Sequence, residues 1–135
     1  MAGAGGFYVL ERSGHALRHV DAAEGIRTVA GTGVKGGSGD GGPAVAASMN
    51  GPKHLCLDRD GSVIIADAEN HVIRRHSPKD GKIKRVACTG KKGAAGLGGD
   101  PQACELARPH GVTIGPDSRL HIADSDNNRI LRIVP

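Results

Sequence analysis

The sequence repeats itself at an interval of 57 residues. The interval places Val29-Ala30 on Val86-Ala87, Thr32-Gly33 on Thr89-Gly90, Pro52 on Pro109, and Ile65-Ala66-Asp67 on Ile122-Ala123-Asp124. Nearer the N-terminus the interval is one residue shorter, since Leu17-Arg18 matches Ile73-Arg74. Self-similarity at such a period indicates a repeat architecture, in which each unit buries its faces against its neighbours.

Each unit contains four short apolar stretches separated by turn residues such as Asp60-Gly61 and Asp80-Gly81. The expected strands are His54–Leu57, Val63–Ala66, Val72–His76 and Ile83–Ala87, then Gly111–Ile114, Leu120–Ala123 and Arg129–Val134, with Phe7–Leu10 and Ile26–Ala30 before them. No useful run with the helical period of 3.6 is present. Four-stranded antiparallel units in series are typical of β-propeller blades, so we expect an all-β fold.

The repeat divides the chain into about two and a half blades within a single partial β-propeller domain, residues 1–135. The expected limits are 7–30 for blade one, 53–87 for blade two, 110–135 for blade three, and 31–52 and 88–109 for two Gly-rich links. In this layout the chain starts at a second strand and stops at a third. We expect it to be part of a longer chain or assembly, or else to form a homo-oligomer that completes the propeller.

The second half of each link has a proline near its start, Pro43 in the first link and Pro101 in the second. Proline suits the first position of a helical turn. We expect one such turn in each link, with Ala46 and Met49 in the first link facing the blade.

Composition narrows the function classes. Aromatic residues make up 1% of the chain, which argues against a single-strand nucleic-acid binder that stacks bases on aromatic rings. The net charge of +4 permits an acidic partner without requiring one. The three cysteines, Cys56, Cys88 and Cys104, have no CxxC spacing, so we expect neither a disulfide framework nor a cysteine zinc site. Unpaired cysteines, and the lack of signal-peptide features or a membrane-spanning run, favour a cytoplasmic location.

The stretches TVAGTG…GDGGPA…GP…LDRDGSVIIADAENHVIRR and RVACTG…RPHGVTIGPDSRLHIADSDNNRILRI resemble the long form of the NHL repeat. The resemblance covers about residues 7–134. It implies a propeller that usually has six blades. It leaves function open, because the sites that carry function are grafted on a fold.

The turns between the second and third strands are the first candidate site. They should share one face with the Gly-rich links, which is the face that propellers usually use for binding. The predicted binding face consists of Asp67, Glu69, Asn70, Asp124, Asp126 and Asn127. The alternative is architectural, since Asp and Asn close tight turns through backbone N–H groups and recur here in each unit.

His110 is the candidate metal ligand, since it stands in Arg108-Pro109-His110-Gly111 where a first strand begins. A similar Pro-His position holds zinc in the peptide-amidating lyase propeller, which this segment resembles. One histidine cannot form a catalytic zinc site, so further ligands would have to lie outside this chain. A calcium loop at Asp124-x-Asp126-x-Asn128 lacks the glycine and glutamate that such loops require. We therefore expect no cofactor.

A basic run breaks the repeat at Lys82, Lys84, Arg85, Lys91 and Lys92. It suggests either phosphate contacts, as in NHL propellers that bind RNA, or lysines that protect an exposed strand edge. We favour the second reading and regard a nucleic-acid partner as the lesser hypothesis. The sequence as a whole predicts a non-catalytic binding or scaffold module for a protein partner. The alternatives are a metal-dependent lyase or lactonase-type propeller and an RNA-binding propeller.

Overall fold

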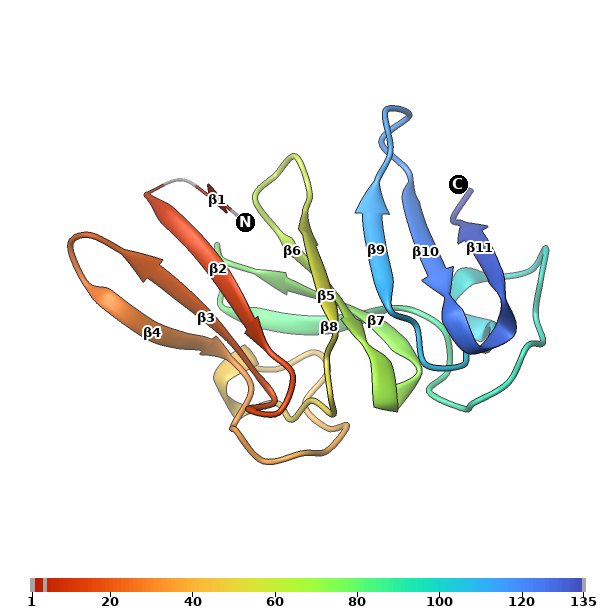
Figure 1. The fold of residues 1–135 in the computed structure, drawn as a ribbon, viewed down its shortest axis with the longest axis horizontal. Helices are drawn as coiled ribbons and strands as arrows, with labels where there is room; N and C mark the ends of the chain where they lie inside the picture. Colours follow the sequence, from red (N-terminus) through yellow and green to blue (C-terminus); the bar gives the residue numbers. More distant parts are fainter. Residues whose placement is uncertain (1, 4, 135) are drawn as a thin grey trace.

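The computed structural model describes residues 2–3 and 5–134, and it consists of three antiparallel sheets standing side by side (Figure 1). Blade one contains β1 (Ala2–Gly3), β2 (Gly6–Glu11), β3 (Ala16–Asp21) and β4 (Gly25–Ala30). Blade two contains β5 (His54–Leu57), β6 (Val63–Asp67), β7 (Val72–Ser77) and β8 (Lys82–Ala87). Within the described residues, blade three contains β9 (Gly111–Ile114), β10 (Leu120–Asp124) and β11 (Arg129–Arg132). Neighbouring strands in each sheet are consecutive in the chain.

The predicted all-β fold and its blade-like sheets are confirmed. The strands at His54–Leu57 and Gly111–Ile114 have the predicted limits, and most of the others extend by one residue. One prediction is wrong: the chain does not start at a second strand, because Ala2 and Gly3 pair with Phe7 and Gly6 as a short β1. The two-residue strand was missed because it contains no apolar alternation to reveal it.

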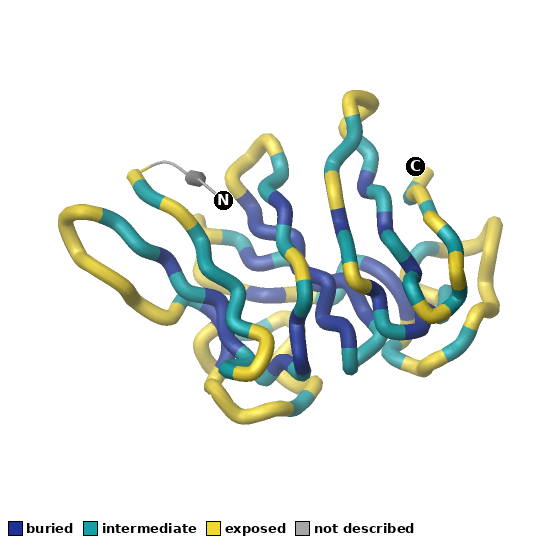
Figure 2. The backbone as a smooth tube through the Cα atoms, viewed as in Figure 1, coloured by how far each residue is buried: buried dark blue, intermediate teal, exposed yellow. Residues whose placement is uncertain are grey.

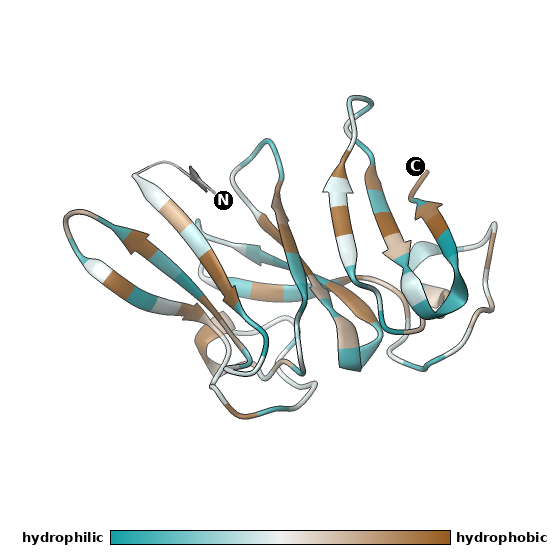
Figure 3. Ribbon diagram, in the orientation of Figure 1, coloured by the Kyte–Doolittle hydropathy of each residue, from teal (hydrophilic) through white to brown (hydrophobic). Residues whose placement is uncertain are grey.

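Two apolar cores lie between the blades (Figure 2). Alternate residues of β6 point to opposite faces of its sheet, so Val63 and Ile65 pack toward blade one while Ile64 and Ala66 pack toward blade three. Every residue of β6 is therefore buried. The brown bands that alternate with polar ones on the strands in Figure 3 follow the same period.

The two links carry short 3-10 turns, η1 (Ala44–Ala46) and η3 (Pro101–Ala103), where a helical turn at a proline was predicted. Ala46 is exposed, however, and Ala44 and Ala47 pack with Met49 in its place. Glycine is needed where the link doubles back, because a Cβ on Gly39 would lie 2.6 Å from the Cα of Ala47. The described residues contain no helix long and apolar enough to cross a membrane.

The first link also pairs with the outer strand of blade two. Gly41 N–H donates to the carbonyl of Ile83 at 2.7 Å, and Ile83 N–H donates to the carbonyl of Gly42 at 3.1 Å. The prediction that Lys82 protects an unpaired strand edge is therefore wrong at this end of β8, because the first link pairs with the strand there. Lys84 is exposed farther along the strand.

Candidate functional site

The predicted binding face forms where the β6–β7 and β10–β11 turns meet the links (Figure 1). These turns contain the short helices η2 (Ala68–Asn70) and η4 (Ser125–Asn127). Glu69 N–H donates to the carbonyl of Asn50 at 3.0 Å, and Asp126 N–H donates to that of Ala107 at 3.1 Å. Each turn therefore hydrogen bonds to the link that precedes its own blade. The turns and the links lie on the same face, as the sequence predicted.

Asp67 and Asp124 lie inside this structure, with 0% of either residue exposed. The carboxylate of Asp67 accepts hydrogen bonds from Asn50 N at 2.9 Å and from the Asn70 side chain at 2.8 Å. That of Asp124 accepts from Ala107 N and from the Asn127 side chain, both at 2.8 Å. The two aspartates therefore hold turn and link together from within, which is the architectural alternative.

The same two aspartates are paired with arginines from different positions. In blade two, Arg74 is 1% exposed and places Nη1 3.3 Å from Asp67 and Nε 3.0 Å from Asp40. In blade three the residue matching Arg74 is Leu131, and Arg129 contacts Asp124 at 2.7 Å instead. Both arginines also donate to link carbonyls. The exchange cannot be seen in the sequence repeat, because the repeat aligns only residues at matching positions.

The calcium interpretation fails on the same contacts. Asp124 already accepts from a backbone N–H, an amide and a guanidinium. A cation at this carboxylate would have to displace those donors, and one of them is itself positively charged. Among residues 2–3 and 5–134, no three His, Cys, Asp or Glu side chains converge as a metal site would require.

The outer part of the rim is a group of titratable residues that we call the rim cluster: Lys53, Glu69, Arg108, His110 and Asp126. His110 and Asp126 are exposed and the other three are half-buried. Arg108 lies between two carboxylates, 2.8 Å from Glu69 and 3.6 Å from Asp126. The hydrogen bond and charge of Arg108 lower the pKa of Glu69. Glu69 and Asp126 were predicted from the sequence, and the structure joins them through an arginine that sequence analysis did not single out.

Lys53 and His110 occupy matching positions before β5 and β9, and their side chains meet across the blades. Nζ of Lys53 lies 2.8 Å from Nε2 of His110. Burial, followed by the charge of Lys53, lowers the pKa of His110, which favours the neutral ring that can accept from the ammonium. Burial and the nearby Arg108 and Arg12 lower the pKa of Lys53. A divalent cation at His110 would face this ammonium, and among the described residues His110 belongs to no group of three or more His, Cys, Asp or Glu side chains that could hold a metal.

Histidines at the blade turns form a further contact between a blade and the link that follows it. His15 and His71 both adopt left-handed backbone conformations, with φ of 51° and 54°. Their Nδ1 atoms accept hydrogen bonds at 3.0 Å from Gly51 N and Arg108 N respectively. Asn128 takes the matching place in blade three with φ of 54°. Because an Nδ1 that accepts a hydrogen bond carries no proton, these contacts require neutral rings.

We expect stability to fall as the pH drops below about 6.5, because burial lowers the pKa of His71 and of His76 below the ordinary 6.5. The unfolded chain then binds more protons than the folded one. The stabilisation is complete above 6.5 and is lost as the pH falls through the lower folded-state values. Urea unfolding at about pH 7.5 and about pH 5 would measure the loss. The His71→Asn variant, which copies Asn128, should lose less stability between these two pH values than the unaltered protein. An equal loss would contradict the assignment of the pH dependence to His71.

The basic run does not form one compact site. Lys91 lies 3.5 Å from Glu105, and Arg85 donates to the carbonyl of Thr89 at 3.3 Å. Lys82, Lys84 and Lys92 are exposed. The run therefore extends from the outer strand of blade two into the second link, where the charge of Lys92 acts on His71 beside Arg108.

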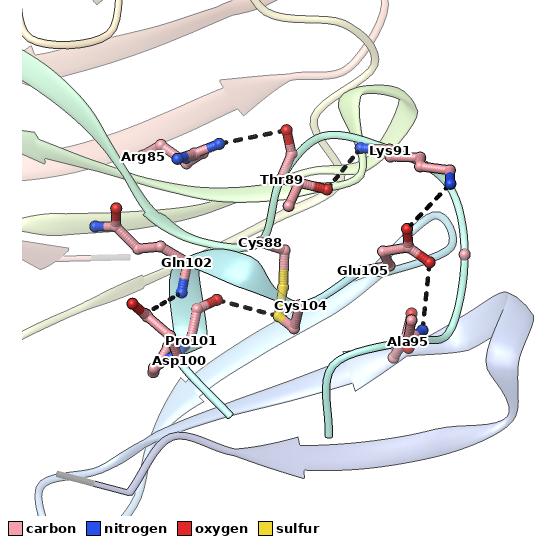
Figure 4. Close-up of a disulfide and its surroundings, with 12 residues drawn as sticks. Arg85, Cys88, Thr89, Lys91, Ala95, Asp100, Pro101, Gln102, Cys104 and Glu105 are labelled. Carbon is pink, nitrogen blue, oxygen red and sulfur yellow. Dashed lines mark hydrogen bonds and ion pairs between the residues drawn. A yellow bond between two sulfur atoms is a disulfide. The ribbon is translucent and has the colours of Figure 1, made fainter. Parts of the chain in front are cut away.

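A disulfide joins Cys88 to Cys104, with a Cα–Cα distance of 4.5 Å (Figure 4). The expectation of unpaired cysteines is wrong, because the second link folds back on itself and brings the two positions together. Gly31 and Ala47 stand at the matching positions of the first link. The expectation of a cytoplasmic, reducing compartment rested on unpaired thiols, and the disulfide removes that support. Cys56 remains free and buried, and burial raises the pKa of its thiol to about 11.

Comparison with known proteins places the fold. No protein-family model matches the chain. It is 37% identical over 128 residues to the protein SUPPRESSOR OF QUENCHING 1, chloroplastic, of Arabidopsis thaliana, a match that covers 91% of this chain and 12% of that protein. The chain therefore spans only a small part of the curated relative it matches.

Solved structures with this fold include an auxiliary nutrient binding protein from Bacteroides ovatus, with a TM-score of 0.79 and 19% identity over 95% of this chain and 34% of that one. A protein of unknown function from Bacteroides thetaiotaomicron gives a TM-score of 0.79 and 18% identity over 93% of this chain and 31% of that one. At these identities the likeness concerns the fold alone. The chain has the fold of consecutive β-propeller blades.

Proposed function

We propose that the chain is a non-catalytic binding module of NHL type, which presents the rim cluster to a protein partner. The observation that supports this most directly is the contact between Lys53 and His110, which joins an ammonium and an imidazole ring at the start of two neighbouring inner strands. The side chains come from different blades, so the fold itself fixes their spacing. Rigid placement reduces the entropy lost when a partner binds.

The charges of the cluster indicate the chemistry of the partner. Glu69 and Asp126 offset the charge of Arg108, whereas no carboxylate of the described residues forms an ion pair with Lys53. Burial and then the repulsion from Arg108 and Arg12 lower the pKa of Lys53, and the charges of Glu69 and Asp126 offset this only in part. An incoming carboxylate would relieve this repulsion and accept a charge-assisted hydrogen bond. We therefore assign the site to an acidic protein segment.

Titration with a glutamate-rich peptide at low and at physiological salt tests the proposal. We expect saturable binding that Lys53→Gln weakens about tenfold, since a charge-assisted hydrogen bond contributes about 1.5–3 kcal/mol. Lys84→Gln is the matched control, because it removes an exposed lysine of the basic run on the outer strand of blade two and should leave binding unchanged. Equal effects of the two substitutions, or no binding at low salt, would refute the rim as the site.

An RNA oligomer titrated in the same assay tests the alternative function, RNA binding. Preferential RNA binding with a steep salt dependence, weakened by Lys84→Gln and kept on Lys53→Gln, would assign binding to the basic run. That result would replace the proposed function with nucleic-acid binding.

A further inference from the structure

Lys53 and His110 stand immediately before two inner strands that lie side by side, β5 and β9 (Figure 1). Their N–H groups donate to backbone carbonyls of β6 and β10, at 3.0 and 3.1 Å respectively. Between the two blades, Val112 N–H donates to Nδ1 of His54 at 3.2 Å. The backbone therefore brings the two side chains together across the blades, with Nζ of Lys53 2.8 Å from Nε2 of His110.

This contact places a lysine amine beside a ring nitrogen that can accept a proton. An amine is a nucleophile only after it has lost its charge, and it gives up a further proton as the new bond forms. Nε2 of His110 lies within the distance of Nζ that a general base needs. Burial, followed by the charge of Lys53, lowers the pKa of His110 below the ordinary 6.5, so the ring is neutral at about pH 8.

The groups around Nζ favour the loss of its charge. Burial, followed by the charges of Arg108 and Arg12, lowers the pKa of Lys53, and the carboxylates of Glu69 and Asp126 oppose this shift. These charges come from four elements: the turn between β2 and β3, η2, the second link and η4. A lysine that stands beside other cations is more often the free amine, which is its nucleophilic form.

We propose that Lys53 is a site of acylation, at which Nζ takes an acyl group from an acyl phosphate and Nε2 of His110 takes the proton. The lone pair of the amine forms an amide bond to the acyl carbon. The bond between that carbon and the phosphate oxygen breaks, and phosphate leaves with the electron pair. The proton passes from Nζ to His110 and then to water. The charges of Arg12 and Arg108 favour this donor because it is an anion.

Acylation regulates the rim cluster, a consequence that rests on the proposed function. The amide product carries no charge, so the repulsion from Arg108 and Arg12 ends. The amide N–H still has Nε2 of His110 as an acceptor. The cation that an acidic segment would meet at Lys53 is gone, so acylation opposes the binding of the partner.

Treating the 135-residue protein with acetyl phosphate tests the site, at about pH 8 and at less than one acetyl group per molecule. Mass spectrometry of the digested protein measures the rate at each lysine. We expect Lys53 to react at least about tenfold faster than Lys84, since a positioned base contributes about a hundredfold or more in enzymes. Lys84 is the internal control, because it lies opposite Arg75 in the sheet and has a cationic neighbour without the contact to His110.

The pH profile separates the base from the surrounding charges. The rate at Lys53 should reach its plateau below the ordinary lysine pKa of 10.5. His110→Gln should lower the plateau about tenfold without moving it along the pH axis, since burial and the arginines set its position. Arg12→Gln should move it to higher pH. Cys56 is buried, so a thiol reagent that leaves it unlabelled shows that each variant is folded.

Two results would overturn the acylation site. One is equal rates at Lys53 and Lys84, and the other is a rate at Lys53 that His110→Gln leaves unchanged in folded protein. Either result leaves the proposed function intact if the glutamate-rich peptide still binds and Lys53→Gln still weakens it.

Peptide binding by the acetylated protein tests the regulatory consequence. Protein acetylated at Lys53 should bind the glutamate-rich peptide about tenfold more weakly, as Lys53→Gln does, because both changes remove the same charge. Selective acetylation of Lys53 together with unchanged or absent peptide binding would refute the proposed function and the regulation, whereas the acylation site itself would stand.

Discussion

Replacing Arg74 with leucine is expected to destabilise the chain by about 3–5 kcal/mol, because a buried carboxylate loses its cation. Asp67, which is 0% exposed, would keep only a backbone N–H and the Asn70 amide as donors. Burial already raises the pKa of Asp67 despite the arginine beside it. The Ser38 and Ser48 carbonyls would lose donors as well.

The urea midpoint measures this loss, and Arg75→Gln is the matched control. Arg75 is the next residue on β7, but its ion pair with Asp58 is about a quarter exposed on both sides. Such a pair contributes about 0–1 kcal/mol. Similar losses for the two substitutions would contradict a special role for the buried pair.

Blade three supplies a rescue for the Arg74 variant. Arg129 matches Val72 in the repeat and reaches its aspartate from there. Adding Val72→Arg and Asp40→Leu to Arg74→Leu copies the arrangement of blade three into blade two. We expect the triple variant to recover much of the lost stability. No recovery would mean that the two arginine arrangements are not interchangeable.

Removing the Cys88–Cys104 disulfide should cost about 2–4 kcal/mol, because the crosslink restricts the unfolded chain. The bond spans 16 residues, so the estimate for short loops applies. Reductant should lower the urea midpoint of the unaltered protein. A midpoint that reductant leaves unchanged would contradict the pairing.

The first link indicates how the crosslink can be removed with least damage. Cys88 has φ of 70°, in the left-handed region, and its counterpart Gly31 has φ of 94°. Cys88→Gly with Cys104→Ala should therefore be about 1 kcal/mol more stable than the double serine variant. Neither variant should respond to reductant, since Cys56 is the one cysteine left.

Thiol labelling counts the bond directly. At about pH 8 the folded protein should take up almost no label, because burial raises the pKa of Cys56 to about 11. Unfolded protein without reductant should take up one label, and reduced unfolded protein should take up three. Three labels without reductant would contradict the disulfide.

The sequence by itself determined the blades. Strand limits follow from apolar alternation and turn residues, both of which are local, and the 57-residue interval carried them from one blade to the next. For the same reason the sequence placed Glu69 and Asp126 on one face with the links. Repetition also indicated that Asp67 and Asp124 serve the architecture, and their burial agrees.

Only the tertiary structure decided which side chains meet between units. The exchange of Arg74 for Arg129 and the Cys88–Cys104 bond depend on how a link folds back, and the pairing of Lys53 with His110 depends on how two blades stand together. A repeat aligns equivalent positions, but it does not show which of them touch or which contacts differ from one unit to the next. Their energies depend on burial, which no local pattern in the chain records.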